Sequence, residues 1–192
     1  TIVHGLDGAS ALDNYTVTHF IPFNPVDKRT EASVTDANGQ GFKVTKGAPQ
    51  AILALAKNQV EIEDTVNQAI ADYAKRGYRA LGVAKTDAQG DWQFLGILSL
   101  FDPPRVDSQS TIEEAAKLGV PVKMVTGDQV LIGRETCRQL GLGTNMVDAA
   151  ALRGVPASQL AHLDKDILQA DGFGQVFPED KYHIVEVYEK HG

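Results

Sequence analysis

The sequence has little cysteine, little tryptophan and no long apolar run. Its one cysteine, Cys137, among 192 residues excludes a disulfide scaffold and a cluster of thiolate metal ligands, and is typical of a reducing compartment. The longest apolar run, Phe94 to Phe101, is far shorter than the ~20 residues that span a bilayer. No secretory signal pattern is found. We therefore expect a soluble chain of cytoplasmic character that makes no membrane contact of its own.

Basic residues are also scarce relative to acidic ones. The formal net charge is −7, and a chain with this balance does not offer the basic face that a nucleic-acid backbone requires. With 43% hydrophobic and 22% charged residues, the composition is that of an ordinary globular protein. At 192 residues the chain has room for one large or two modest domains.

Residues 1–101 combine strand and helix patterns. Tyr15 to Ile21 and Gly41 to Lys46 alternate and are rich in β-branched residues, and Glu31 to Thr35 alternates more weakly. Asn38-Gly39 predicts a hairpin because both residues tolerate positive φ. Further strands are expected at 79–85 and 92–101, and helices at 49–56 and 62–76, with Gly77 ending the second helix. Antiparallel strands with flanking helices predict an α+β domain.

Residues 102–192 follow a different rhythm, in which strands alternate with helices. The pattern predicts helices at 108–118, 130–140 and 179–190, strands at 120–125 and 173–177, and two shorter segments at 158–163 and 167–170. This order is typical of a parallel α/β sheet. Because only two strands are visible and such sheets usually have more, we expect this second domain to be incomplete.

Four basic residues of the first domain, and one ring, are candidates for binding an anion with a planar base. Lys46 ends a strand, beside Gly47 and just before a helix start, where an ammonium group and free helix amides would meet an anion together. A solvated lysine beside a helix is the plainer interpretation. Phe23 has a ring face for a planar base, or it packs in a core. The remaining basic candidates are Lys28, Arg29 and Arg79.

The second domain has its polar candidates at a strand end and a helix start. Thr126-Gly127-Asp128 ends a strand at the edge where open α/β sheets bind phosphates and metals, or it caps the next helix. Lys181 is a fixed cation for a phosphoryl group, or a surface lysine. Asp102 to Arg105 contains two prolines, which predict a stiff hinge or linker between the domains.

Taken together, the segments resemble the cytoplasmic region of P-type cation-transporting ATPases, most closely the plasma-membrane proton pump branch. The match is ordered and extends from Thr18 over nearly all of the chain. The residues that carry it are FIPFNPVDKRT at 20–30, KGAP at 46–49, FDPPR at 101–105, KMVTGDQ at 123–129, GLGTNM at 141–146, ADGF at 170–173 and VFPEDKY at 176–182.

The resemblance implies roles for these residues. In the nucleotide pocket, Lys46, with Gly47, is similar to the family's lysine, Phe23 to the ring against adenine, Lys28 and Arg29 to the basic pair beside it, and Arg79 to the arginine that reaches the ATP phosphates. Asp102 is similar to a hinge residue that touches nucleotide. The loop that receives the γ-phosphate corresponds to Thr126, Gly127 and Asp128, and the lysine near the phosphorylated aspartate to Lys181. Gln175 stands near the place where many relatives have an arginine, and no phosphate role is assigned to it.

The resemblance also implies a domain plan: a nucleotide-binding domain at 1–101 and part of a haloacid-dehalogenase-like phosphorylation domain at 102–192. The family's Asp-Lys-Thr-Gly-Thr and Gly-Asp-Gly-Val-Asn-Asp segments, which hold the nucleophile and the magnesium ligands, do not occur in the sequence. The expected chain therefore binds ATP and does not hydrolyse it. Its expected partners are the actuator domain, the rest of the phosphorylation domain and the membrane helices of one integral membrane pump, with Mg²⁺ as cofactor of the whole protein and a proton as the transported ion.

Two alternatives belong to other classes of protein. A haloacid-dehalogenase-type phosphatase shares the fold of the second domain. Such an enzyme needs an Asp-x-Asp pair at the end of its first strand, and the sequence shows no such pair at a strand end. A structural module of the same fold that binds no nucleotide is the other alternative, and Lys46 and Arg79 argue against it.

Overall fold

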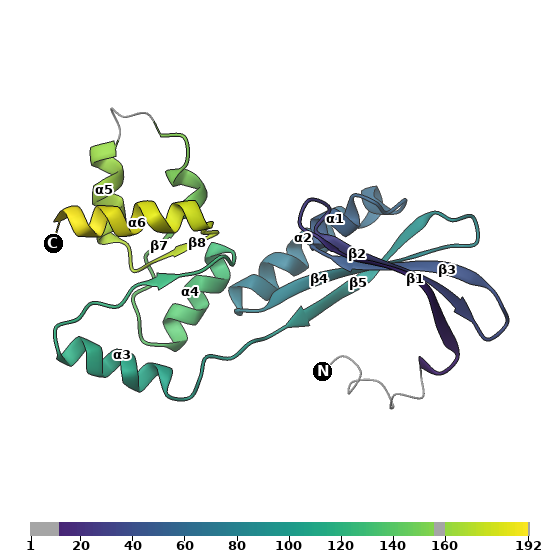
Figure 1. Cartoon of the computed structure of the whole chain (residues 1–192), viewed down its shortest axis with the longest axis horizontal. Helices are drawn as coiled ribbons and strands as arrows, with labels where there is room; N and C mark the ends of the chain where they lie inside the picture. Colours follow the sequence, from purple (N-terminus) through teal and green to yellow (C-terminus); the bar gives the residue numbers. More distant parts are fainter. Residues whose placement is uncertain (1–11, 156–159, 192) are drawn as a thin grey trace. The chain divides into compact units, whose positions relative to one another are not determined.

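The computed structural model describes residues 12–155 and 160–191. The chain forms two compact units, one of Thr1–Ala71 with Ala80–Leu100 and one of Asp72–Arg79 with Phe101–Gly192. Each unit has its own sheet (Figure 1). A five-stranded antiparallel sheet lies in the first and a three-stranded parallel sheet in the second. The predicted mixture of antiparallel and parallel α/β structure is confirmed at this level.

The five strands of the first sheet lie in chain order. Its elements are β1 (Tyr15–Asn24), β2 (Arg29–Asp36), β3 (Gly41–Gly47), α1 (Pro49–Leu53), α2 (Gln59–Lys75), β4 (Arg79–Thr86) and β5 (Trp92–Leu100). The predicted hairpin is present between β2 and β3: Gly39 has φ +78°. The Asp36 carboxylate accepts hydrogen bonds from the backbone amides of Asn38 and Gln40, both at 2.9 Å. This turn sets the register of β2 and β3.

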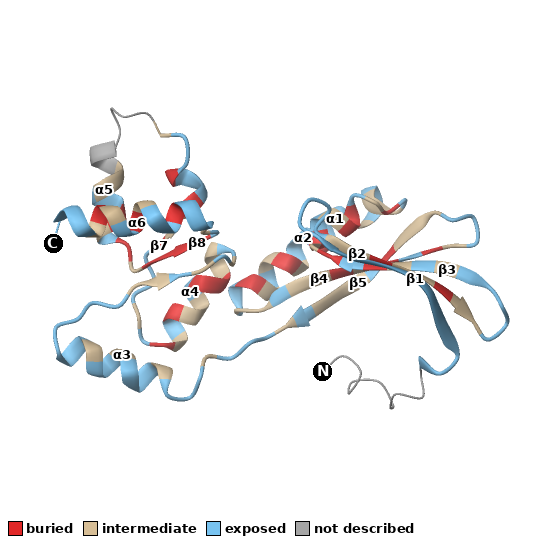
Figure 2. Cartoon of the chain, in the orientation of Figure 1, coloured by how far each residue is buried: buried red, intermediate tan, exposed pale blue. Residues whose placement is uncertain are grey.

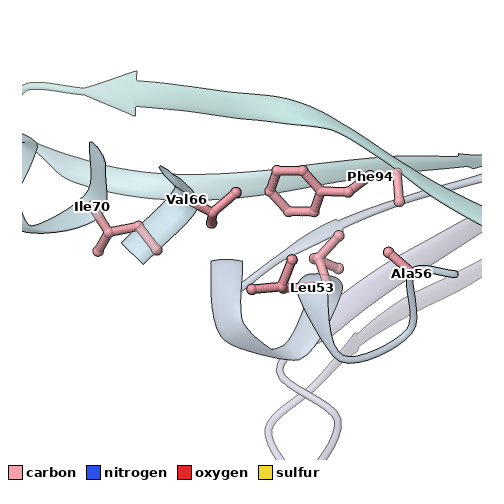
Figure 3. Close-up of a cluster of buried hydrophobic side chains, with 7 residues drawn as sticks. Leu53, Ala56, Val66, Ile70 and Phe94 are labelled. Atoms are coloured by element: carbon pink, nitrogen blue, oxygen red, sulfur yellow. The ribbon is translucent and has the colours of Figure 1, made fainter. Parts of the chain in front are cut away.

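Helices α1 and α2 pack on one face of this sheet (Figures 1 and 3). Proline at the start of α1 has the φ that a helix needs and no amide that would lack a partner. Apolar residues four apart on α2, Val66 and Ile70, are both buried. The core they join comprises Ile52, Leu53, Ala56, Val66, Ile70, Ala84 and Phe94. The other face of the sheet has no such cover among the described residues.

The second unit is built around a short, fully buried strand. Its elements are α3 (Ser108–Lys117), β6 (Met124–Val125), α4 (Val130–Gln139), β7 (Met146–Asp148), the 3₁₀ helix η3 (Ala149–Leu152), α5 (Leu160–Gln169), β8 (Gly172–Gly174) and α6 (Pro178–His191). The strand order is β6-β8-β7. All three residues of β8 are buried (Figure 2), because parallel strands are covered on both faces.

The structure corrects three details of the second domain. It has three strands where the sequence pattern shows two, since β7 is too short to display an alternation. Strand β6 covers only the end of the predicted 120–125 segment, and Pro121 has no amide hydrogen to donate there. No residue of α3 is buried, so this helix does not contribute to a core. None of the described helices is long and apolar enough to cross a lipid bilayer.

Candidate functional site

An open pocket of about 310 Å³ lies on the first sheet around Lys46. Residues directly paired across neighbouring strands share a face, and Lys46 is paired with Thr30 on one side and Val83 on the other. Two residues earlier on β3, Val44 is paired with Ala32 and so lies on the same face. Apolar side chains form most of the wall: Phe20, Ala32, Val44, Val83 and Leu98.

This pocket is on the face opposite α1 and α2. Thr45, the neighbour of Lys46, is paired with Ala84 of the helix-covered core. Because successive residues of a strand point to opposite faces, Lys46 points away from the helices. Its side chain is exposed, and no ion pair of Lys46 occurs among the described residues.

Gly47 lies against the turn that contains Lys28. The amide of Ala48 donates to the carbonyl oxygen of Lys28 at 2.9 Å, and the amide of Lys28 donates to Asn24 O at 2.7 Å. Lys28 has φ +53°, in the left-handed region. A Cβ at position 47 would collide with Lys28 O and would lie 2.7 Å from Arg29 Cα. The glycine thus permits the close packing that brings the two predicted basic segments together.

Arg29 lies on the other face of the sheet from Lys46. It is paired with Gly47, and its guanidinium forms an ion pair with Glu31, with Nη1 and Oε2 2.6 Å apart. Lys43 Nζ is 3.1 Å from the other oxygen of the same carboxylate. These two cations, Arg29 first, hold the pKa of Glu31 below its usual range although burial opposes them. The sequence analysis did not identify Glu31, the acid that forms an ion pair with Arg29.

Phe23 is near the end of β1, just before the turn at Asn24. Its residue is 61% exposed, and it does not line the pocket around Lys46. All ten residues of β1 are exposed, so the predicted ring is at the surface and not in a core.

In the second unit, Thr126-Gly127-Asp128 forms a loop directly after β6. The amide of Thr126 donates to Phe173 O at 3.0 Å, and the loop's own carbonyls accept from Gln175 and Val176 at 2.7 and 3.0 Å. The amide of Asp128 donates to Thr126 Oγ1 at 3.1 Å. The predicted loop therefore lies at the carboxyl end of the sheet and is fixed in one conformation by backbone hydrogen bonds.

Arg79 and Asp128 form a bidentate pair inside the second unit. Arg79 Nε and Nη2 donate to the two carboxylate oxygens of Asp128 at 2.8 and 2.9 Å, and Arg79 Nη1 is 3.5 Å from Asp102 Oδ2. The guanidinium lowers the pKa of Asp128, against the opposing effect of burial. A pocket of about 300 Å³ is lined by Arg79, Asp102, Thr126 and Asp128. Four predicted residues from three separate segments of the sequence thus line one pocket.

Lys181 is in the first turn of α6, just after Gln175 and Val176, whose amides donate to the carbonyls of Asp128 and Thr126. It is exposed, and its backbone amide donates to Phe177 O at 3.2 Å. Among the described residues, Lys181 takes part in none of the ion pairs.

A second charged cluster, which sequence reasoning missed, also lies at this edge of the sheet. Arg153 Nη2 donates to Asp180 Oδ2 at 2.6 Å and to Gln175 O at 2.7 Å. Gln175 has φ +56°, and its side-chain amide donates to Asp148 at 2.6 Å. Asp148 is brought here by strand β7, which the sequence pattern did not predict. The cluster could therefore be identified only from the fold.

No group of three or more His, Cys, Asp or Glu side chains in the described parts of the chain is arranged to hold a metal ion. A comparison of the chain with models of known protein families finds no match. The candidate residues provide a cationic amine beside apolar walls in one unit, and a loop of hydroxyl, amide and carboxylate groups in the other.

Proposed function

We propose that this chain is the ATP-binding cytoplasmic region of a P-type cation-transporting ATPase, with a nucleotide-binding domain at 1–101 and part of a haloacid-dehalogenase-like phosphorylation domain at 102–192. The observation that carries the proposal is the pocket around Lys46, where one exposed ammonium group stands beside an apolar wall. A nucleotide has matching parts, since its base is flat and weakly polar and its phosphates are anionic. Pockets of this kind, apolar with a few placed polar groups, are typical of small-molecule sites.

Lys46 and Lys28 are the cations proposed to meet the phosphates. Both side chains are exposed, and the close contact of Gly47 with the Lys28 turn holds their backbones together. Arg29 differs from these two lysines: at the start of β2 it forms an ion pair with Glu31 on the opposite face of the sheet, so no phosphate contact is assigned to it.

The residues of the second unit are proposed to receive the phosphoryl group. In the parent pump, a carboxylate oxygen outside this chain would attack the γ-phosphorus while the bond to the β–γ bridging oxygen breaks and ADP leaves. Hydrogen-bond donors fixed before the reaction stabilise the charge that develops on the phosphoryl oxygens. The Thr126 hydroxyl, the Gly127 amide and the Lys181 ammonium are the donors we assign to this task.

The bidentate pair of Arg79 and Asp128 would have to open, or Asp128 would have to share the guanidinium with the ligand, before Arg79 contacts a phosphate.

The chain by itself is expected to bind ATP and leave it intact, because it lacks the nucleophile segment and because Mg²⁺ is assigned to ligands of the full pump. The transported cation is proposed to be a proton, and the pump's membrane helices and actuator domain are the proposed partners.

Titration of the isotope-labelled chain with ATP, followed by amide chemical shifts, tests the proposal. We expect a Kd near 1 mM, which corresponds to ~4 kcal/mol, with shifts centred on Lys46. Lys46→Ala should raise the Kd at least tenfold, because a charge-assisted contact contributes ~1.5–3 kcal/mol and each ~1.4 kcal/mol is a factor of ten. Lys43→Ala is the matched control. Lys43 is on the same strand as Lys46, but its side chain forms an ion pair with Glu31 on the opposite face of the sheet. An absence of shifts at several millimolar ATP, or equal effects of the two substitutions, would overturn the proposal.

A further inference from the structure

Arg153, which follows the 3₁₀ helix η3, contacts three residues of the segment 175–180, where β8 leads into α6. Its Nη2 donates to the carbonyl oxygen of Gln175 at 2.7 Å and to Asp180 Oδ2 at 2.6 Å, and its Nε donates to Asp180 Oδ1 at 3.0 Å. Its Cζ lies 4.0 Å from the centre of the Phe177 ring. Because a guanidinium group is planar and rigid, these contacts fix the segment in more than one direction.

The same segment holds the loop that follows β6. The amide of Gln175 donates to Asp128 O at 2.7 Å, and the amide of Val176 donates to Thr126 O at 3.0 Å. These two hydrogen bonds join the loop to the segment that Arg153 contacts. A change in the backbone at Gln175 would therefore move the groups assigned to receive the phosphoryl group.

The backbone at Gln175 is in a conformation that needs support. Its φ is +56°, in the left-handed region, which a residue with a side chain keeps only where its surroundings hold it. Arg153 donates to its carbonyl oxygen, and Asp148 accepts a hydrogen bond from its side-chain amide at 2.6 Å. Arg153 is thus one of two groups that hold the conformation from which Gln175 reaches the loop.

Arg153 also acts on the helix turn that contains Lys181. The amide of Phe177 donates to Asp180 Oδ2 at 2.8 Å, and the amide of Lys181 donates to Phe177 O at 3.2 Å. Asp180 is buried beside Arg153. Without that cation, its carboxylate would repel an anion bound to the neighbouring Lys181. Arg153 therefore fixes the first turn of α6 and neutralises the acid next to Lys181.

We propose that Arg153 is a positioning residue of the phosphoryl-receiving site: by holding the segment 175–180, it fixes the loop at 126–128 and Lys181 relative to each other. This inference rests on the proposed function and adds a residue that supports its second half. Arg153 acts through Gln175 and Asp180 and is assigned no contact with the phosphoryl group itself. Hydrogen-bond donors stabilise a transferred phosphoryl group only when they are fixed in place beforehand, and Arg153 supplies part of that fixation.

Arg153→Lys is the variant that separates positioning from charge. A lysine keeps a cation for Asp180, but its ammonium is one compact group and cannot reproduce the fork of donors that reaches Gln175 and Asp180 together. Arg153→Ala removes the charge as well. Arg138→Ala is the matched control, because Arg138 also forms a bidentate pair, which joins it to Glu135 within α4.

Two NMR measurements on the isotope-labelled chain test the inference. Scalar couplings across the hydrogen bonds from Gln175 to Asp128 and from Val176 to Thr126 report how firmly the loop is held. Inorganic phosphate, titrated at constant ionic strength, is followed by the amide chemical shifts of the loop and of Lys181. The wild-type chain is expected to bind phosphate with a Kd on the order of 10 mM, about tenfold weaker than the value expected for ATP.

Arg153→Lys should reduce both couplings and weaken phosphate binding about fivefold, because the donors are no longer fixed in place. Arg153→Ala should weaken it further, since Asp180 is left as an uncompensated charge, and Arg138→Ala should stay within about twofold of wild type. Wild-type phosphate affinity in Arg153→Lys, whatever its stability in urea, would overturn this inference while the proposed function stands. If the wild-type chain binds no phosphate at this loop, the assignment of the receiving site in the proposed function is overturned as well.

Discussion

In the first unit the candidate side chains on β1 and β3 project from a sheet, whereas in the second they stand on a loop or in the first turn of a helix that comes after a strand. Lys46 and Phe20 are on strands β3 and β1 and face solvent. Thr126 and Asp128 come after β6, and Lys181 comes after β8. The difference follows from how each sheet is covered.

The core formed with α1 and α2 lies on one face of the antiparallel sheet, so Lys46 and other side chains on the opposite face are accessible. The parallel sheet has a central strand, β8, in which every residue is buried. Parallel sheets are covered on both faces, and they bind ligands at the carboxyl ends of their strands. An accessible polar group on this sheet therefore has to stand at a strand end.

The largest expected effect tests whether the two cores are separate. Phe173→Ala removes a ring that is 0% exposed in the second core, and Ile52→Ala removes a side chain that is 0% exposed in the first. Such truncations cost ~2–5 kcal/mol. Trp92, the single tryptophan, packs on the first core, so its fluorescence during denaturation reports that core. Ile52→Ala should lower the midpoint of the tryptophan transition, and Phe173→Ala should lower only the circular-dichroism midpoint. Equal shifts of the tryptophan midpoint in both variants would contradict the separation.

A substitution at Gly47 tests whether the pocket around Lys46 depends on the close packing of two backbone segments. Gly47→Ala places a methyl group against the Lys28 carbonyl and 2.7 Å from Arg29 Cα, which are backbone atoms that have little room to move. We expect a loss of about 3 kcal/mol in the free energy of unfolding, at the upper end of overpacking, together with weaker ATP binding. Gly41→Ala is the control on the same strand, where an added Cβ meets nothing within 4 Å, and it should stay within ~0.5 kcal/mol. Similar losses in the two variants, measured by urea denaturation, would refute this explanation.

Arg153 tests how the loop edge of the second sheet is held. Its partner Asp180 is buried, with a side chain 7% exposed, and also accepts a hydrogen bond from the Phe177 amide at 2.8 Å. Arg153→Ala leaves that carboxylate without its cation and should cost about 2 kcal/mol in urea denaturation. Arg138→Ala removes a more exposed pair with Glu135 within α4 and should cost less than ~0.5 kcal/mol. The explanation is wrong if the two losses are the same.

The smallest expected effect concerns the pH dependence of the Arg79–Asp128 pair. The folded-state pKa of Asp128 is below its usual value because of Arg79, so the pair stabilises the fold above the unfolded-state pKa of ~3.9. That stabilisation, below ~1 kcal/mol for a partly exposed pair, is lost as the pH falls through the folded pKa. Arg79→Gln should raise the pKa of Asp128 in a carboxyl NMR titration and leave that of Asp180, which Arg153 holds low, unchanged. A pKa of Asp128 that stays low in the variant would count against the pair as its cause.

Strand and helix patterns were sufficient to predict most elements of the first unit, because strands β1 to β5 are long enough to show their alternation and Gly39 and Gly77 mark a turn and a helix end with positive φ. Strand β7 escaped prediction for the opposite reason, since three residues carry no period. The Asp148–Gln175–Arg153 cluster was also not predicted, because its residues are far apart in sequence. Gln175 is 27 residues from Asp148 and 22 residues from Arg153.

For the candidate site, residue types and local motifs predicted that Lys46, Thr126, Asp128 and Lys181 stand at strand ends or helix starts, and the structure places them there. The partner of Arg79 was not predictable, because packing between distant segments selects it from many acids of equal local character: Asp128 is 49 residues from Arg79. Glu31 is two residues from Arg29 on β2, so strand alternation by itself places the two side chains on one face.

The sequence by itself determined where the turns fall and which residues alternate, since backbone conformation and hydrophobic period are local properties of the chain. Only the tertiary structure decided which face of the first sheet stays open, which ring shares that face with Lys46, and which carboxylate neutralises Arg79. Those outcomes depend on strand register and on packing between distant segments, and a register shift of one residue would move every side chain of a strand to the other face.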